Sequence, residues 1–161
     1  MISVAVIGGG ASGMAFAVAL KQKRPDIEVT VFEKNPKVLK KILVTGNGRG
    51  NILNFYAVAE NYFEACEFVR PAVEKYAPKK TEAIFRDMGL LLMSEQEGRA
   101  YPISQTAASV VCVLSSAAER AGVKVFTDTP VKSIKKSQGR FVINNDKSFD
   151  FGFEPNYIIE I

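Results

Sequence analysis

The chain has 161 residues, of which 47% are hydrophobic and 24% are charged, and its formal net charge is +4. This composition is typical of one globular domain with its own core, and no apolar run reaches the ~18 to 20 residues of a membrane-spanning helix. Histidine is absent, which excludes a Ser-His-Asp triad and a histidine-based metal site. Cys66 and Cys112 are too few for a disulfide scaffold or a metal cluster, so we expect a cytoplasmic protein without a metal site.

The first part of the chain predicts two strands joined by a helix. Residues 3–7 and 27–32 are apolar β-type runs, and residues 11–23 favour a helix that is apolar on nearly all sides. Two strands joined by a crossover helix imply a parallel pair with a right-handed connection.

A glycine-rich turn between the first strand and the helix has the pattern G-x-G-x-x-G. Gly8 allows the sharp turn, Gly10 lets a pyrophosphate approach the backbone, and Gly13 lets the helix pack closely on the strand. The N–H groups at the start of the helix would face the phosphates. Glu33, 20 residues beyond Gly13, can accept hydrogen bonds from both ribose hydroxyls of an adenosine, and it disfavours the 2′-phosphate of NADP. The alternative is a tight turn in an ordinary βαβ unit.

Residues 45–54 are rich in glycine and asparagine and predict an irregular loop. Such a loop can present several N–H groups, and Arg49 adds a cation, so it suits an anionic or polar flat ligand. The alternative is a surface loop with turn residues. The lysines clustered in residues 34–41 and 132–136 lack interleaved aromatic residues, so we interpret them as solvated faces rather than a nucleic-acid site.

The middle of the chain predicts three helices and one short strand. The helices are expected over residues 60–75, 82–88 and 105–121, and the strand over residues 90–93. Pro71 should kink or restart the first of these helices, and Ser104 should cap the last one.

Short β-type runs fill the rest of the chain. They cover residues 123–127, 131–135, 141–145, 149–153 and 157–161. Hairpin-type turns separate the second, third and fourth runs, which predicts an antiparallel three-stranded meander. We therefore predict an α/β fold: a Rossmann-like three-layer domain with a parallel sheet and an antiparallel β-meander. Residues 123–127 should join the parallel sheet, in the order second strand, first strand, then this strand or further out.

Four stretches of the sequence together are typical of one family. They are Ile7–Met14, Phe32–Lys34, Lys40–Asn51 and Glu97–Ser104. Their order resembles the glutathione-reductase-like flavoproteins, and more narrowly the HI0933-like (YhiN-like) family of FAD/NAD(P)-dependent oxidoreductases. The first two stretches are shared by many flavoproteins, whereas the last two are more specific. The resemblance covers residue 1 to about residue 150.

The resemblance implies FAD as the cofactor, with NAD(P)H as a candidate electron donor. The pyrophosphate would lie over residues 8–13, the loop of residues 41–54 along the flavin, and the backbone of Val131 against adenine. The expected cofactor-binding residues are Gly8, Gly10, Ala11, Ser12, Gly13, Glu33, Lys34, Lys41, Thr45, Gly48, Arg49, Asn51 and Val131. The family usually has cysteine at the position of Gly50, so a thiol role there is absent. No residue is identified as a catalytic acid or base.

The resemblance also implies that residues 1–161 are the N-terminal fragment of an FAD-binding domain. Relatives continue into a turn that covers the FAD, a substrate domain and a C-terminal return segment. We therefore expect weak FAD binding, and self-association through apolar surface that those segments would cover.

Two functions remain open. The first is the FAD-binding portion of a flavin-dependent oxidoreductase that acts on an unknown small-molecule substrate, without nucleic-acid or membrane partners. The alternative is a truncated nucleotide-binding module without turnover. An NAD-dependent Rossmann enzyme is disfavoured, because the meander stands where such a domain would continue with βαβ units.

Overall fold

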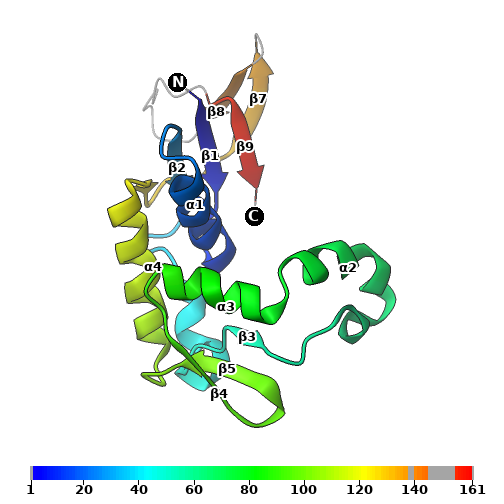
Figure 1. The fold of residues 1–161 in the computed structure, drawn as a ribbon. Coiled ribbons are helices and arrows are strands. Elements are labelled where there is room, and N and C mark those ends of the chain that lie inside the picture. The colour runs from blue at the N-terminus through cyan, green and yellow to red at the C-terminus, as the bar shows by residue number, and fades with distance from the viewer. Residues whose placement is uncertain (1, 138–139, 145–154, 161) are drawn as a thin grey trace. The chain divides into compact units, whose positions relative to one another are not determined.

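The structure is a computed structural model, and it describes residues 2–137, 140–144 and 155–160 (Figure 1). The chain folds into two compact units. The first unit comprises Met1–Lys41 and Leu114–Ile161, and the second comprises Ile42–Val113.

A four-stranded parallel sheet forms the centre of the first unit (Figure 1). Its strands, in spatial order, are β6 (Lys124–Phe126), β2 (Glu28–Phe32), β1 (Ser3–Ile7) and β9 (Tyr157–Glu160). The parallel pairing of the first two strands is confirmed, with Val4 opposite Val29. The predicted place of the third strand is wrong, because β9 pairs with the other edge of β1 and β6 instead pairs with β2.

Helix α1 (Ala11–Lys23) connects β1 to β2 and packs on the sheet. Its buried residues are Gly13, Met14, Ala17 and Val18, while the other sides of the helix stay partly exposed, so the expectation of burial on nearly all sides is too strong. The central residues of β1 and β2 are buried, which makes this contact a part of the hydrophobic core. Helix α4 (Ala107–Ala121) adds Leu114, Ala117 and Ala118 to that core.

An antiparallel pair of strands follows β6 along the chain, as predicted for the first two strands of the meander. It consists of β7 (Ser133–Ser137) and β8 (Arg140–Asn144), with Ile134 opposite Ile143. The third strand expected for the meander, residues 149–153, lies outside the described residues.

The second unit contains a small antiparallel sheet that was not predicted as such. Its order is β3 (Leu53–Asn54), β5 (Arg99–Pro102) and β4 (Leu92–Ser94). Residues 45–54 were expected to be irregular throughout, but the last two of them pair with β5. Three 3₁₀ segments and two helices complete this part: η1 (Lys40–Gly48), η2 (Ala59–Ala65), η3 (Gln96–Gly98), α2 (Cys66–Lys75) and α3 (Pro78–Asp87).

Helix ends in this part differ from the prediction for local backbone reasons. Pro71 lies inside α2, and the interruption comes earlier, at Phe63, whose φ is 48°. Helix α3 begins at Pro78, since proline suits the first helical turn. Helix α4 begins at Ala107 rather than Gln105, because Gln105 has a φ of 58° and cannot continue a right-handed helix.

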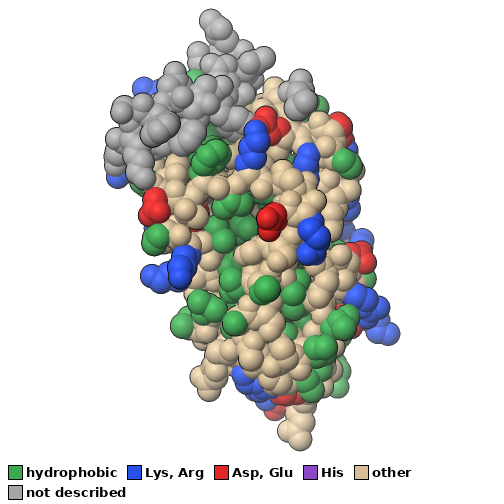
Figure 2. Space-filling model, turned by 90° about the vertical axis from the view of Figure 1, so that its left-hand side faces the viewer, with side chains coloured by type: hydrophobic (Ala, Val, Ile, Leu, Met, Phe, Trp, Pro, Cys, Tyr) green, Lys and Arg blue, Asp and Glu red, His purple; other side chains and the backbone are tan. Residues whose placement is uncertain are grey.

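The surface carries mixed charge and some large apolar side chains. On the face shown in Figure 2, basic and acidic side chains are interspersed with hydrophobic ones. Neither α2 nor α3 has a buried residue, and Phe63 and Phe68 are almost fully exposed. Self-association through such residues stays a prediction. Within the described part of the chain, no helix has the length and apolar character needed to cross a membrane.

The contact of α1 with β1 predicts different costs for two glycine substitutions. A Cβ on Gly13 would lie 2.0 Å from the carbonyl oxygen of Gly8, so Gly13→Ala must push the helix away. We expect a loss of about 1 to 3 kcal/mol in unfolding free energy. Gly10→Ala is the matched control, because its Cβ would meet no atom within 4 Å. Urea denaturation measures both, and equal midpoints would contradict the proposed packing role of Gly13.

Candidate functional site

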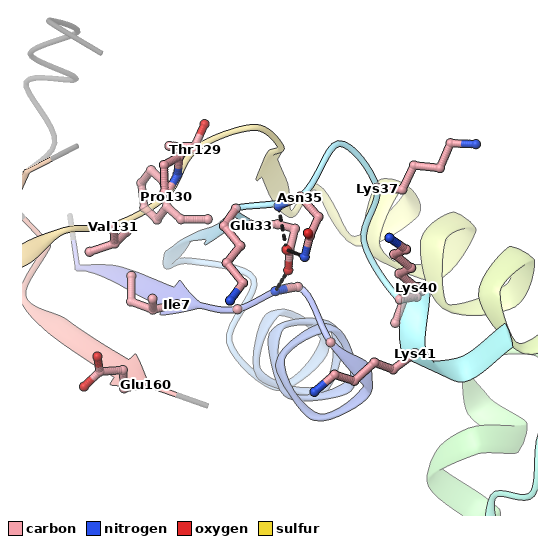
Figure 3. A pocket seen from close by; sticks show the side chains of 16 residues that line it. Ile7, Glu33, Asn35, Lys37, Lys40, Lys41, Thr129, Pro130, Val131 and Glu160 are labelled. Atoms are coloured by element: carbon pink, nitrogen blue, oxygen red, sulfur yellow. Dashed lines mark hydrogen bonds between the residues drawn. The ribbon is translucent and has the colours of Figure 1, made fainter. Parts of the chain in front are cut away.

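A pocket of about 390 Å³ lies at the carboxyl ends of the parallel strands in the first unit (Figure 3). It is bounded by the glycine turn after β1, the residues that follow β2, the segment between β6 and β7, and the end of β9. Ligands of open α/β sheets bind outside this edge. The lining residues are Ile7, Gly8, Gly9, Gly10, Phe32, Glu33, Lys34, Asn35, Lys37, Leu39, Lys40, Lys41, Thr129, Pro130, Val131 and Glu160.

The three consecutive glycines of the turn meet different surroundings. Gly8 has a φ of 111°, which only glycine adopts readily, and its N–H donates to the carbonyl of Phe32 at 2.8 Å. A Cβ on Gly9 would lie 2.6 Å from the Val38 side chain, so no side chain fits at this position. Gly10 is exposed, and a Cβ there would meet open space on the pocket side. The turn therefore leaves room for a ligand at Gly10 but not at Gly9.

The Glu33 carboxylate is buried at the end of β2 and held by three donors (Figure 3). The N–H of Gly9 donates to Oε2 at 2.8 Å. The N–H of Asn35 donates to Oε1 at 2.8 Å, and the Asn35 side-chain amide donates to the same oxygen at 2.6 Å. Burial raises the pKa of the Glu33 carboxyl, but the hydrogen bonds from Asn35 and Gly9 outweigh it, so the pKa lies below its ordinary value.

The segment after β6 is tied to the same strand end. The N–H of Glu33 donates to the carbonyl of Phe126, and the N–H of Thr129 donates to the carbonyl of Glu33, both at 2.8 Å. The N–H of Asp128 donates to the carbonyl of Asn35 at 3.1 Å. These bonds place the residues before Val131 beside Glu33, and Val131 lines the pocket.

The pocket carries more positive than negative charge. Four lysines line it, against the carboxylates of Glu33 and Glu160. The lysines are Lys34, Lys37, Lys40 and Lys41, all of them exposed. This balance, together with the start of α1 beside Gly10, favours an anionic ligand such as a pyrophosphate.

The predicted site residues divide into three groups. Six of them line this pocket: Gly8, Gly10, Glu33, Lys34, Lys41 and Val131. Three belong to the first turn of α1, where Ala11 and Ser12 are exposed and Gly13 is buried. The other four, Thr45, Gly48, Arg49 and Asn51, belong to the second unit, and their contribution to FAD binding stays a prediction.

In the second unit, the glycine-rich loop is held by its own hydrogen bonds. The Thr45 hydroxyl donates to the carbonyl of Ile42 at 2.7 Å, and the Asn51 amide donates to the carbonyl of Ala100 at 3.1 Å. Gly50 has a φ of 75°, and a Cβ there would lie 2.9 Å from the Cα of Ala107. Any side chain at this position, a thiol included, would have to displace the start of α4.

Arg49 forms a polar cluster with residues around β5. Its guanidinium carbon lies 4.0 Å from the centre of the Tyr101 ring. Its Nε donates to Gln105 at 2.7 Å, and the guanidinium also pairs with Glu95, which lowers the pKa of that carboxyl. A polar pocket of about 500 Å³ is lined by Arg49, Glu95, Gln96, Arg99 and Tyr101. The Arg49 charge is thus partly neutralised within its own unit.

Ten of the 16 lining residues were not predicted as site residues, and three of these ten donate hydrogen bonds to Glu33. Gly9 lies inside the fingerprint, yet its role depends on the distance to Val38, which no spacing rule gives. Asn35, two residues after Glu33, could have been found as a local side-chain donor, because asparagine often bonds to groups near it in the chain. Thr129 carries no such signal, since its position depends on the pairing of β6 with β2.

Comparison with known proteins gives one family and two instructive curated relatives. The model of the family described as HI0933-like protein Rossmann domain matches residues 2–155. A 3-dehydro-bile acid delta(4,6)-reductase of Clostridium scindens is 37% identical over 147 residues, which are 91% of this chain and 36% of the relative. A ribosomal RNA dihydrouridine synthase of Haemophilus influenzae is 25% identical over 94% of this chain and 36% of the relative. The chain thus spans about a third of the length of these relatives.

Solved structures show the same fold at low sequence identity. THI4 of Thermovibrio ammonificans superposes with a TM-score of 0.58 at 18% identity, over 89% of this chain and 48% of that one. The L-alpha-glycerophosphate oxidase of Mycoplasma pneumoniae, solved with FAD bound, gives a TM-score of 0.54 at 17% identity, over 98% of this chain and 53% of that one. The fold is therefore Rossmann-like, and the oxidase solved with FAD bound shares it.

The hydrogen bonds to Glu33 predict a pH-dependent contribution to stability. In Glu33→Gln one acceptor oxygen becomes a donor that faces N–H groups, which should cost about 1 to 3 kcal/mol at pH 7. Because the folded pKa is below the unfolded value of about 4.3, the wild-type advantage is complete above that value and is lost as the pH falls through it and below. Denaturant titrations of both proteins between neutral and acid pH measure the difference. A gap that stays constant with pH would contradict this assignment.

Proposed function

The chain belongs to the HI0933-like protein family, and we propose that its Rossmann domain binds FAD in the pocket at the carboxyl ends of β1 and β2. In this proposal the adenosine ribose lies at Glu33, the pyrophosphate over the turn at Gly10, and adenine against the backbone near Val131. The single observation that carries it is the structure of the turn. Neighbouring atoms leave no room for a side chain at Gly9 or Gly13, whereas a Cβ on Gly10 would meet open space. A βαβ turn without a ligand has no need of a glycine at that third position.

Each part of the pocket has a task in this proposal. The N–H groups at the start of α1 and the lysines on the rim, Lys34, Lys37, Lys40 and Lys41, stabilise the negative charge of the pyrophosphate. The Glu33 carboxylate, which the bonds from Gly9 and Asn35 keep ionised, accepts from the ribose and repels a 2′-phosphate. Bound FAD would supply hydride or electron transfer.

For the whole protein we propose a flavin-dependent oxidoreductase, with NAD(P)H as the candidate electron donor. The curated relatives are named for a bile acid and for ribosomal RNA, so their names do not agree on a substrate class. We therefore propose no substrate, and the expectations of no nucleic-acid partner and of a cytoplasmic location stay predictions. A nucleotide-binding module without turnover is the second candidate, because the described pocket offers groups for adenosine and pyrophosphate and, among its lining residues, no tyrosine, cysteine or histidine.

The cofactor proposal predicts what the purified protein releases and rebinds. After denaturation of freshly purified protein, chromatography should identify FAD as the released ligand, in less than stoichiometric amount because we expect weak binding. The emptied protein should bind FAD and ADP in a calorimetric titration. A protein that releases and binds only a nicotinamide nucleotide would overturn the proposal. Retained ADP binding without flavin binding would favour the second candidate.

Gly10→Val tests the position of the pyrophosphate. The valine side chain would fill the open space at Gly10, so affinity for both FAD and ADP should fall by at least about ten-fold, equivalent to ~1.4 kcal/mol. Folding should change little, since a Cβ there meets no atom within 4 Å. Calorimetric titration and thermal denaturation of the same sample separate the two effects. Unchanged affinity would show that the pyrophosphate lies elsewhere.

A further inference from the structure

The acceptor sites of the Glu33 carboxylate are unequally used. A carboxylate oxygen has two lone pairs in its plane, and each can accept one well-aligned hydrogen bond. Oε1 receives two bonds, from the main-chain N–H and from the side-chain amide of Asn35, at 2.8 and 2.6 Å. Oε2 receives one, from the N–H of Gly9 at 2.8 Å. Among the described residues, the donors thus saturate Oε1 and leave one lone pair free on Oε2.

Asn35 is held where it makes both of these bonds. Its carbonyl accepts from the N–H of Asp128, which fixes its backbone against the segment after β6. Its side chain lines the pocket beside Glu33, and Figure 3 shows the amide directed at the carboxylate. The bond to Oε1 is charge-assisted, and bonds of this kind are about twice as strong as neutral ones. A ligand hydroxyl must displace this amide to reach Oε1.

A ribose presents two neighbouring hydroxyl donors to the site. A carboxylate binds both equally only when each of its oxygens has a lone pair to offer. We propose, on the basis of the proposed adenine-nucleotide site, that Asn35 is a specificity-determining residue that makes Glu33 bind one ribose hydroxyl through Oε2 and leave the other to water or to the Asn35 amide. The ribose is then recognised asymmetrically, one hydroxyl by an ionised acceptor and the other by neutral partners.

The energetic consequence is a difference between two deoxynucleotides. Loss of a hydrogen bond to a charged group weakens binding by about ten-fold or more, while loss of a neutral one weakens it by about two- to ten-fold. Removing the hydroxyl bound by Oε2 should therefore weaken binding by about ten-fold or more, equivalent to ~1.4 kcal/mol per ten-fold. Removing the other should weaken it less, by about two- to ten-fold.

The experiment is a calorimetric titration of the full 161-residue chain with ADP, 2′-deoxy-ADP and 3′-deoxy-ADP. The expected result is one strongly weakened deoxynucleotide and one that is clearly less weakened. Large and equal losses for the two would overturn the inference, since they require both oxygens of Glu33 to bind. Equally small losses would also overturn it. If ADP does not bind at all, the proposed function fails and the inference with it.

Asn35→Ala provides a second, independent arm. This variant keeps the main-chain bond to Oε1 and frees one lone pair on that oxygen, so the deoxynucleotide that was less weakened in the wild type should now also bind more weakly than ADP, by about ten-fold or more. Lys37→Ala is the control, because Lys37 lines the pocket but is not among the described residues that bond to Glu33; it should weaken all three nucleotides by the same factor. An asymmetry that survives in Asn35→Ala would assign it to another residue and overturn the role of Asn35.

Discussion

A buried hydrogen bond from the N–H of Gly9 to the Glu33 carboxylate joins the ends of β1 and β2, next to the main-chain bond from Gly8 to Phe32. A carboxylate buried at this point needs donors, because an unpaired buried charge would cost several kcal/mol. The turn after β1 can supply one of them only if Gly8 turns sharply and Gly9 carries no side chain. The same turn then brings Gly13 against the Gly8 carbonyl and sets the path of α1 over the sheet.

The pocket follows from that arrangement. With Gly9 and Gly13 in close contact with the protein, Gly10 is the position of the turn that faces free space. The positive end of α1 and the lysines on the rim give that space a positive potential, and the Glu33 carboxylate bounds the pocket at the end of β2. A site for a nucleotide with a negatively charged middle and a ribose at one end thus needs no residue outside the first unit.

Much of the first unit could be predicted from the sequence, because its signals are local. Residues 3–7 and 11–23 have the bounds that the pattern predicted, and the G-x-G-x-x-G spacing placed Gly8 and Gly10 at the pocket. The place of β6 was predicted wrongly, because alternation of apolar residues predicts a strand but not its neighbour. In the second unit the pairing of β3 with β5 joins residues more than 40 positions apart, and two residues give too short a pattern to read. Asn35 was missed although its spacing from Glu33 is typical of a local donor, while the carboxylate oxygen that it bonds to cannot be predicted from the sequence.

The pairing of β6 with β2 has a consequence for how the chain can vary in length. Three main-chain hydrogen bonds fix the register of the residues from Phe126 to Thr129 relative to Glu33 and Asn35. One inserted or deleted residue there would shift this register and remove a hydrogen bond from the end of β2, which carries the carboxylate. The main-chain bond of Gly122, just after α4, is local, because its N–H donates to the carbonyl of Glu119 at the end of the same helix. We therefore expect insertions and deletions to be tolerated in the connection between α4 and β6. In the segment directly after β6 we expect them to be selected against.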